Sequence, residues 1–232
     1  MTVDYKDIVA CWDFDRLTPG GLLYDYGPHE LHATPGAGAA APTRNLDGSY
    51  YFDGGDNFLL SGTSQTRFYA NAPTGDMTIL SLVASQLAGG AYTIVGAPAF
   101  IAGSFYGWEF DETAAGGSHV YHFIGDATLP QSAATAPTLV QNNSRHVVCT
   151  TVETAPRWMV QSSRVAASWV GGAMAPCVYW PATVPTIGSG ISNLWIGNMY
   201  YLCAIRGAIS NDDLAFYSRM LMDGKKPHCV RT

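Results

Sequence analysis

Three acidic side chains in segment 108–113 have the residue types and spacing that could carry catalysis. Glu109, Asp111 and Glu112 fall in one strand-like run, and a pair of carboxylates about 5 Å apart is what retaining glycoside hydrolysis requires. Because alternate residues of a strand share a face, Glu109 and Asp111 point the same way as Thr113. Glu112 points to the opposite face unless a β-bulge re-aims it. That face therefore lacks a second glutamate, and we expect no hydrolase activity.

Other sites of chemistry are not predicted. The sequence contains no Gly-x-Ser-x-Gly nucleophile elbow, no Gly-x-x-x-x-Gly-Lys phosphate loop and no dinucleotide-binding glycine turn. His29 and His32, with Asp25 nearby, could place metal ligands in one loop, but no third or fourth ligand is spaced beside them. His119 and His122 are three residues apart in a strand, so they face opposite ways. We interpret His29 and His32 as turn residues.

Aromatic residues are the candidates for a binding surface. Trp169, Tyr179 and Trp180 lie in or beside the Gly- and Pro-rich segment Gly171–Gly190, where strand neighbours are not expected to bury them. Sugar rings stack on such faces, and aromatic side chains also supply contact area at protein interfaces. The alternative is that the loop folds back and these rings close the end of the core. Three other tryptophans fall within strand patterns and are expected in the core: Trp12, Trp158 and Trp195.

The chain is poor in charge, which bears on its partners. Only 13% of its 232 residues are charged, against roughly 25% in ordinary globular domains. Either much of the surface contacts other protein, or the loops are simply rich in Gly and Ala. The net charge of −6 argues against nucleic acid, which needs a basic face. No run of about 18 apolar residues is present, and Met1–Lys6 does not resemble a signal peptide, so we expect no membrane partner.

Strand-like segments recur along the whole chain and predict an all-β protein. Clusters of Gly, Pro, Asn and Asp separate them, and Asp76–Ala84 is apolar on both alternating faces, which is typical of a covered central strand. The segments are Ile8–Phe14, Tyr50–Phe52, Asp76–Ala84, Ala91–Val95, Trp108–Phe110, His119–Ile124, His146–Val152, Arg157–Gln161, Leu194–Ile196 and Met199–Arg206. Three stretches between them are expected to be surface loops: Ala33–Thr43, Asp126–Pro137 and Gly171–Gly190. No linker divides the segments, so residues 1–232 are expected to form one domain.

One helix is predicted near the end of the chain. Ser210 can cap its start, Asp213 three residues on completes a capping box, and Gly224 marks its end. Leu214, Tyr217 and Leu221 would share one helix face.

Five cysteines are spread through the chain without a C-x-x-C pair: Cys11, Cys149, Cys177, Cys203 and Cys229. Their isolation predicts small, buried core residues rather than a zinc or redox site. A disulfide between distant strands remains the alternative.

The order of these segments resembles the laminin G-like, concanavalin A-like jelly roll. Ile8–Asp15 ends in an aromatic residue followed by an acid, and Ser49–Leu60 contains the family's Phe-Asp-Gly strand and turn. Leu23–Gly36 shares Asp25 and Gly27 with the family's Asp-x-Ser-Gly-Asn-Gly loop. Further matches are Arg145–Glu153, Leu194–Asn198 and Ala204–Leu221. The resemblance spans about residues 8–222 and implies a two-sheet antiparallel β-sandwich (jelly roll) with one short C-terminal helix.

The resemblance also bears on chemistry. The family's glucanase branch carries Glu-x-Asp-x-Glu on one strand, and here Thr113, or Ala114 in a longer variant, stands at the acid/base position. This implies a non-catalytic member. Some members hold calcium through loop acids and carbonyls, and Asp53, Asp56 and Asn57 offer such oxygens. The same residues suit a tight turn, so a calcium site stays open as the alternative to no cofactor.

Together these features predict a structural or adhesive module of an assembled particle, specifically a bacteriophage capsid decoration or tail protein located in the virion. Its partners would be other virion proteins or further copies of the chain. The alternative is a carbohydrate-binding, lectin-like domain that binds surface glycans through Trp169, Tyr179 and Trp180. A glycoside hydrolase is the least favoured reading, because Thr113 stands where a carboxylate is required.

Overall fold

The computed structural model describes residues 3–16, 21–71, 76–86, 91–96, 99–101, 104–113, 117–124, 131–133, 143–153, 155, 157–163, 166–170, 184–189 and 194–227. Some strand side chains, including that of Trp169, lie outside this description, as do all those of residues 99–133 except Phe110.

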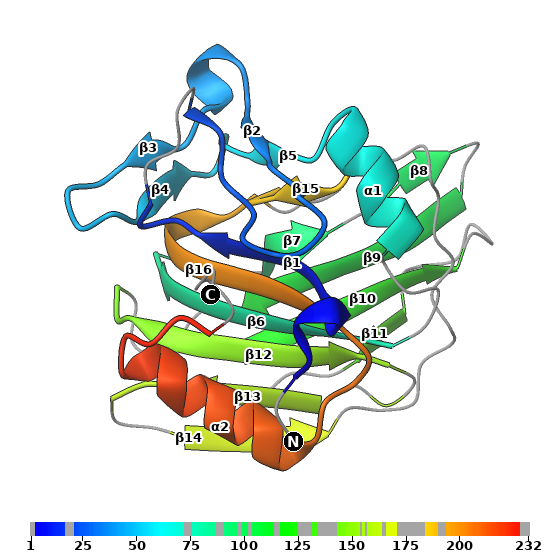
Figure 1. Cartoon of the computed structure of the whole chain (residues 1–232), viewed down its shortest axis with the longest axis vertical. Coiled ribbons are helices and arrows are strands. Elements are labelled where there is room, and N and C mark those ends of the chain that lie inside the picture. Colours follow the sequence, from blue (N-terminus) through cyan, green and yellow to red (C-terminus); the bar gives the residue numbers. More distant parts are fainter. Residues whose placement is uncertain are drawn as a thin grey trace.

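The described strands form two antiparallel sheets that pack face to face (Figure 1). The first sheet has the strand order β14-β13-β12-β6-β16-β4-β3, and β1 also pairs with β16. The second has the order β11-β10-β9-β7-β15-β5-β2, and β8 pairs with β9. This arrangement confirms the predicted fold class, a two-sheet antiparallel β-sandwich with a C-terminal helix.

The elements have the following bounds. The first sheet contains β1 (Ile8–Asp13), β3 (Thr43–Arg44), β4 (Tyr50–Asp53), β6 (Met77–Ser85), β12 (His146–Val152), β13 (Arg157–Gln161), β14 (Ala166–Val170) and β16 (Ile196–Arg206). The second contains β2 (Thr34–Pro35), β5 (Phe58–Leu59), β7 (Ala91–Gly96), β8 (Ala99–Ile101), β9 (Ser104–Thr113), β10 (Gly117–Ile124), β11 (Gln131–Ala133) and β15 (Thr186–Ile187). The helices are α1 (Thr63–Asn71) and α2 (Asn211–Met222), with 3-10 turns η1 (Tyr5–Asp7) and η3 (Gly38–Ala40).

Apolar side chains from the facing sides of the two sheets form the main core. Trp12 of β1 points into it, whereas its neighbour Cys11 belongs to a second cluster on the outer face, as strand alternation requires. Trp158 of β13 and Trp195 are completely buried in the same core, and Phe110 reaches it from β9. The prediction that the three tryptophans are core residues is therefore confirmed.

Helix α2 covers the outer face of the first sheet (Figure 1). Three of its residues lie in the outer apolar cluster together with residues of β6, β12 and β16: Leu214, Tyr217 and Leu221. Strand β6 is consequently buried along its whole length, because one face meets the main core and the other meets this cluster. The predictions of a doubly covered strand near Asp76–Ala84 and of a capped C-terminal helix are both confirmed.

The stretches predicted to be surface loops are only partly so. Strand β2 begins inside Ala33–Thr43, β11 lies inside Asp126–Pro137, and β15 lies inside Gly171–Gly190. Ile187 of β15 is completely buried. Each of these strands is two or three residues long, which is too short to show the alternation that identifies a strand in sequence.

Two further elements differ from expectation. The segments Leu194–Ile196 and Met199–Arg206 are not separate strands, because β16 runs continuously from Ile196 with a register shift between Met199 and Tyr201. Helix α1 was not predicted, because among its described side chains only Phe68 is buried and no apolar stripe marks it.

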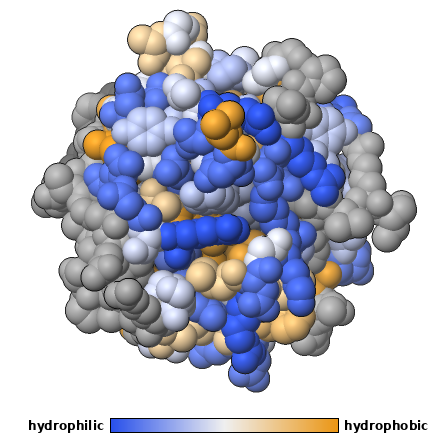
Figure 2. Space-filling view, turned by 90° about the vertical axis from the view of Figure 1, so that its left-hand side faces the viewer, coloured by the Kyte–Doolittle hydropathy of each residue, from blue (hydrophilic) through white to orange (hydrophobic). Residues whose placement is uncertain are grey.

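On one side of the molecule, the described residues expose little continuous apolar surface. In Figure 2 hydrophilic residues dominate the described surface, and hydrophobic residues show as scattered spots. Such single exposed apolar residues are ordinary on protein surfaces. None of the helices in the described part of the chain is both long and apolar enough to cross a bilayer.

Candidate functional site

The predicted aromatic site is described only in part. Trp169 lies in β14, where its backbone pairs with Trp158 of β13. Tyr179 and Trp180 lie outside the described residues, as does the side chain of Trp169. This site therefore stays a prediction.

The acidic run lies on β9, a strand in the second sheet. Its backbone pairs with β7 and β10, and a register shift in β7 lies opposite it, between Thr93 and Val95. The side chain of Phe110 is buried in the core. The side chains of Glu109, Asp111, Glu112 and Thr113 lie outside the described residues.

Two of the three predicted calcium ligands, Asp53 and Asp56, act as turn caps. Asp53 Oδ1 accepts a hydrogen bond from the backbone N–H of Gly55 at 2.8 Å, and Asp56 Oδ2 accepts one from the backbone N–H of Asp53 at 2.9 Å. Burial raises the pKa of the Asp56 carboxyl. Within the described residues, no group of three or more His, Cys, Asp or Glu side chains is arranged to hold a metal ion. These contacts support the turn interpretation for Asp53 and Asp56. Asn57 Oδ1 is buried without a hydrogen-bond partner among the described residues, and the calcium alternative stays a prediction.

Asp25 forms a buried backbone cradle rather than a metal site with His29 and His32. Its Oδ1 accepts hydrogen bonds from the backbone N–H groups of Cys11 (2.6 Å) and Gly27 (2.7 Å), and its Oδ2 accepts one from Leu31 (2.7 Å). Burial raises the pKa of this carboxyl, while the three N–H donors oppose the rise. A Cβ at Gly27 would lie 2.9 Å from Asp25 Oδ1, which explains the glycine. His32 instead accepts a hydrogen bond from the backbone N–H of Asp25.

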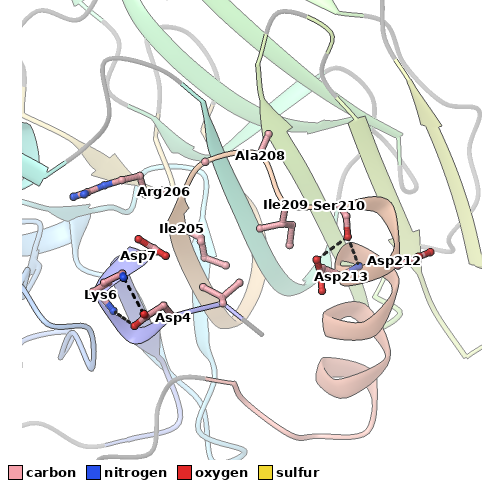
Figure 3. Close-up of a pocket in the computed structure, with 12 residues that line it drawn as sticks. Asp4, Lys6, Asp7, Ile205, Arg206, Ala208, Ile209, Ser210, Asp212 and Asp213 are labelled. Carbon is pink, nitrogen blue, oxygen red and sulfur yellow. Dashed lines mark hydrogen bonds and ion pairs between the residues drawn. The ribbon is translucent and has the colours of Figure 1, made fainter. Parts of the chain in front are cut away.

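A cleft of about 580 Å³ opens between the N-terminal segment and the start of α2 (Figure 3). One wall is the segment Val3–Asp7, which contains η1, and the opposite wall is the first turn of α2. The floor is the end of β16 and the connection that follows it, residues 205–209. Its volume falls in the range of about 300–1,000 Å³ that small-molecule sites occupy.

The floor of the cleft is fixed by partly buried polar contacts. Thr78 Oγ1 donates to the carbonyl of Gly207 at 2.8 Å and accepts from the backbone N–H of Ile209 at 3.1 Å. The guanidinium of Arg157 donates to the carbonyl of Ile209 at 2.6 Å and is itself paired with Glu153 at 2.8 Å. These contacts hold the connection between β16 and α2 in one conformation.

The N-terminal wall is tied to the same helix. The backbone N–H of Val3 donates to Tyr217 Oη at 3.0 Å. On the other side of η1, Tyr5 Oη donates to the carbonyl of Tyr26 at 3.0 Å. The two walls are therefore held in place before any ligand arrives, which lowers the entropic cost of binding.

The cleft joins charged groups to an apolar floor. Its lining contains four carboxylates, two cations, one hydroxyl and four apolar side chains: Asp4, Asp7, Asp212 and Asp213; Lys6 and Arg206; Ser210; and Val3, Ile205, Ala208 and Ile209. The backbone N–H of Lys6 and its ammonium hold the pKa of Asp4 below its usual value. The Ser210 hydroxyl lowers the pKa of Asp213 in the same way. Both carboxylates are thus ionised at neutral pH and can accept hydrogen bonds.

The sequence pattern does not predict this cleft. Ser210 and Asp213 are predicted as a capping box, and the structure confirms that pair, with the Asp213 backbone N–H donating to Ser210 Oγ at 3.1 Å. Nothing in the local pattern connects them to Asp4 and Asp7 at the other end of the chain.

Replacing Ser210 by alanine should lower the free energy of unfolding by about 1 kcal/mol, because α2 loses its N-cap. The Asp213 pKa is depressed in the folded state, so its contribution is present above the unfolded value of about 3.9 and is lost as pH falls through the folded value. Urea unfolding at pH 7 and pH 3 measures both effects. Ser168→Ala, at an exposed position of β14, is the control. Equal stability of the two variants would contradict the cap.

Comparisons with known proteins bear on the fold. No protein-family model and no curated protein sequence matches the chain. It is similar to the CBM40 of the Ruminococcus gnavus IT-sialidase bound to α2,3 sialyllactose, with a TM-score of 0.58 and 11% identity over 78% of this chain and 99% of that one. It is similar to the botulinum neurotoxin serotype C1 binding domain, with a TM-score of 0.63 and 9% identity over 94% of this chain. The match covers 53% of that domain, so the chain spans about half its length.

A third similar structure is a GH54 α-L-arabinofuranosidase, with a TM-score of 0.57 and 12% identity over 88% of this chain and 50% of that one. At such low identities the likeness concerns the fold alone. The chain thus shares a two-sheet β-sandwich fold with a sialyllactose-bound CBM40.

Proposed function

We propose that the chain is a carbohydrate-binding module and that the cleft between η1 and α2 is its site. The observation that carries this proposal is the lining of the cleft, in which ionised carboxylates, cationic donors and a hydroxyl surround an apolar floor. A sugar offers hydroxyl groups that donate and accept hydrogen bonds at the edge of a ring with apolar faces, so this combination suits it. The fold shared with a sialyllactose-bound CBM40 supports the same reading.

The charge of the cleft selects among sugars. Four carboxylates outnumber the two cations, and Lys6 already forms an ion pair with Asp4 at 3.1 Å. A sialic acid or uronic acid would bring another carboxylate next to Asp7 and Asp212, and like charges at close range disfavour binding. We therefore assign the cleft to neutral sugars.

The proposed role is binding without catalysis. Its support is Thr113 at the position where a hydrolase of this kind needs a second carboxylate. Trp169, Tyr179 and Trp180 remain a proposed second site for the same function, because aromatic faces stack on sugar rings. The two sites make different predictions for point variants.

A glycan array tests the proposal. The intact chain should give signals on neutral oligosaccharides that exceed those on their sialylated counterparts. The double variant Asp7→Ala/Asp212→Ala should weaken the neutral signals by about tenfold or more, because hydrogen bonds to charged groups contribute about 1.5–3 kcal/mol each. Asp223→Ala removes an exposed acid at the other end of α2 and should leave binding unchanged.

Each alternative has its own outcome on the array. If Trp169→Ala or Trp180→Ala loses the glycan signal while Asp7→Ala/Asp212→Ala binds fully, the carbohydrate site lies at the aromatic residues and not in the cleft. The absence of any glycan signal, or a preference for sialylated glycans, would contradict the cleft proposal.

A structural role in an assembled particle is a second candidate. Its support is the low charged fraction of 13%, because a protein that stays free in solution usually carries more charge on its surface. Sedimentation of the purified chain across a concentration series distinguishes the two functions. An assembly protein would self-associate as the concentration rises, whereas a binding module would stay monomeric.

A further inference from the structure

Two of the buried cysteines lie directly opposite each other on neighbouring strands. Cys11 of β1 and Cys203 of β16 are register partners in an antiparallel pair. Strands β1, β16, β6 and β12 lie side by side in the first sheet (Figure 1). Both cysteines belong to the apolar cluster on its outer face, so their side chains emerge on the same side. Both are completely buried, and neither is part of a disulfide.

The backbone hydrogen bonds identify the type of pair. The N–H of Cys11 donates to Asp25 Oδ1 at 2.6 Å, and its carbonyl accepts from the N–H of Tyr26 at 2.7 Å. Both backbone groups of Cys11 therefore point away from β16. Phe14 is three residues from Cys11, so its backbone groups point the opposite way, and its N–H donates to the Tyr200 carbonyl on β16. Cys11 and Cys203 thus form a non-hydrogen-bonded pair, in which the Cα atoms are about 4.5 Å apart and the side chains are closest.

This geometry falls within the range of protein disulfides, whose Cα atoms lie about 4.4–6.8 Å apart. The third buried cysteine does not share it. Cys149 of β12 pairs with Leu80 of β6, and Leu80 pairs on its other side with Cys203. With adjacent strands about 4.8 Å apart, Cys149 is about 10 Å from Cys203, which is beyond disulfide range.

We propose that Cys11 and Cys203 are a redox-sensitive pair that forms a cross-strand disulfide when a small-molecule disulfide is present as oxidant. The sulfur of one cysteine attacks the S–S bond of oxidised glutathione, which gives a mixed disulfide and releases one reduced glutathione. The second cysteine then attacks the protein sulfur of the mixed disulfide and releases the other. Two thiol protons and two electrons leave the protein, and one oxidised glutathione becomes two reduced ones.

A disulfide between Cys11 and Cys203 would leave no neighbouring polar group without a hydrogen-bond partner. Cys11 Sγ lies 3.5 Å from Tyr201 Oη and 3.7 Å from the carbonyl of Pro227. Tyr201 Oη itself donates to the Pro227 carbonyl at 2.7 Å. After the thiol proton is lost, that carbonyl therefore still has its hydroxyl donor.

The hydrogen bond between Tyr201 and Pro227 also controls the access of oxidant to Cys11 and Cys203. The segment after α2 crosses over Cys11 and is held there by Tyr201, and by the ion pair between Lys226 and Asp13 at 2.5 Å. Oxidant reaches the thiols when this segment is undocked, so the bond forms during folding or after local opening. Once formed, it links the first strand of the described chain to its last and closes a loop that includes nearly all of the chain.

Refolding of the full chain tests the proposal. The variant Cys149→Ser/Cys177→Ser/Cys229→Ser retains only the proposed pair and should be refolded from denaturant with either a glutathione redox buffer or a phosphine reductant. With glutathione we expect a mass lower by two hydrogen atoms, no free thiol, and a peptide linking Cys11 to Cys203. The melting temperature should rise by about 10 °C relative to the reduced form, because the unfolded chain is constrained.

Wild-type protein provides the second measurement. Peptide mapping after the same refolding should again join Cys11 to Cys203. Cys149 should stay reduced, because burial raises its pKa to about 12 and neither of the other two described cysteines is in reach. Adding Cys203→Ala to the three-serine variant should abolish the mass change. The proposal would be overturned if wild-type protein refolded with glutathione showed a native circular dichroism spectrum while the thiols of Cys11 and Cys203 still reacted after unfolding.

Discussion

Asp25→Ala should lower the free energy of unfolding by about 4 kcal/mol. The Asp25 carboxylate is completely buried and receives the backbone N–H groups of Cys11, Gly27 and Leu31 at 2.6–2.7 Å. Alanine leaves three donors without an acceptor away from water, and each unsatisfied buried group costs about 1–3 kcal/mol. Urea unfolding followed by tryptophan fluorescence measures the loss.

Asp25→Asn is the matched variant for this prediction. Its amide oxygen can still accept from Cys11 and Gly27, but its NH₂ group would face the N–H of Leu31. We expect an intermediate loss of about 2 kcal/mol, because one donor of three is left unpaired. Unfolding curves for both variants that overlay the wild-type curve would show that the cradle does not stabilise the fold.

Gly197→Ala should lower the free energy of unfolding by about 3 kcal/mol. Gly197 of β16 has a φ of +135°, and a Cβ there would lie 2.3 Å from the carbonyl oxygen of Ala84 and 2.9 Å from the Cα of Ser85. Both atoms belong to the backbone of β6, so they cannot move aside as the end of a side chain could. Conformational strain and steric overlap each cost about 1–3 kcal/mol.

Gly207→Ala separates these two costs. Gly207 has a φ of +85°, but a Cβ there would meet no atom within 4 Å. Its replacement should therefore cost about 1 kcal/mol, which is the conformational term alone. Thermal unfolding of the two variants measures the difference. Equal melting temperatures would mean that the contact between β16 and β6 relaxes without cost.

Much of the fold could be predicted from the sequence, because the long strands carry apolar residues on the faces that become buried. Strands β1 and β6 are buried along their whole length, and the double coverage of Asp76–Ala84 follows from its apolar residues on both alternating faces. Asp25 and Gly27 match the loop of the family that the sequence resembles. The structure explains both residues, because Asp25 accepts the backbone N–H of Gly27 and a Cβ at Gly27 would clash with that carboxylate. The narrower laminin G-like and virion readings stay predictions.

The candidate cleft could not be predicted, because its walls are far apart in sequence. Asp4 and Asp7 precede the first strand, whereas Asp212 and Asp213 begin the last helix. The pairing of β1 with β16 and the hydrogen bond from the Val3 N–H to Tyr217 Oη bring these segments together. Short strands such as β15 were missed for a related reason, since their pairing partners and not their own pattern make them strands.

Amide hydrogen exchange with and without the strongest neutral glycan from the array shows where the sugar binds. If the sugar binds in the cleft, the amides of residues 3–7 and 205–213 should exchange more slowly when it is present, because binding suppresses the local opening of both walls. Those of β14 should be unchanged. Protection confined to β14 and the residues after it, or no protection at any glycan concentration, would contradict the assignment of the cleft as the carbohydrate site.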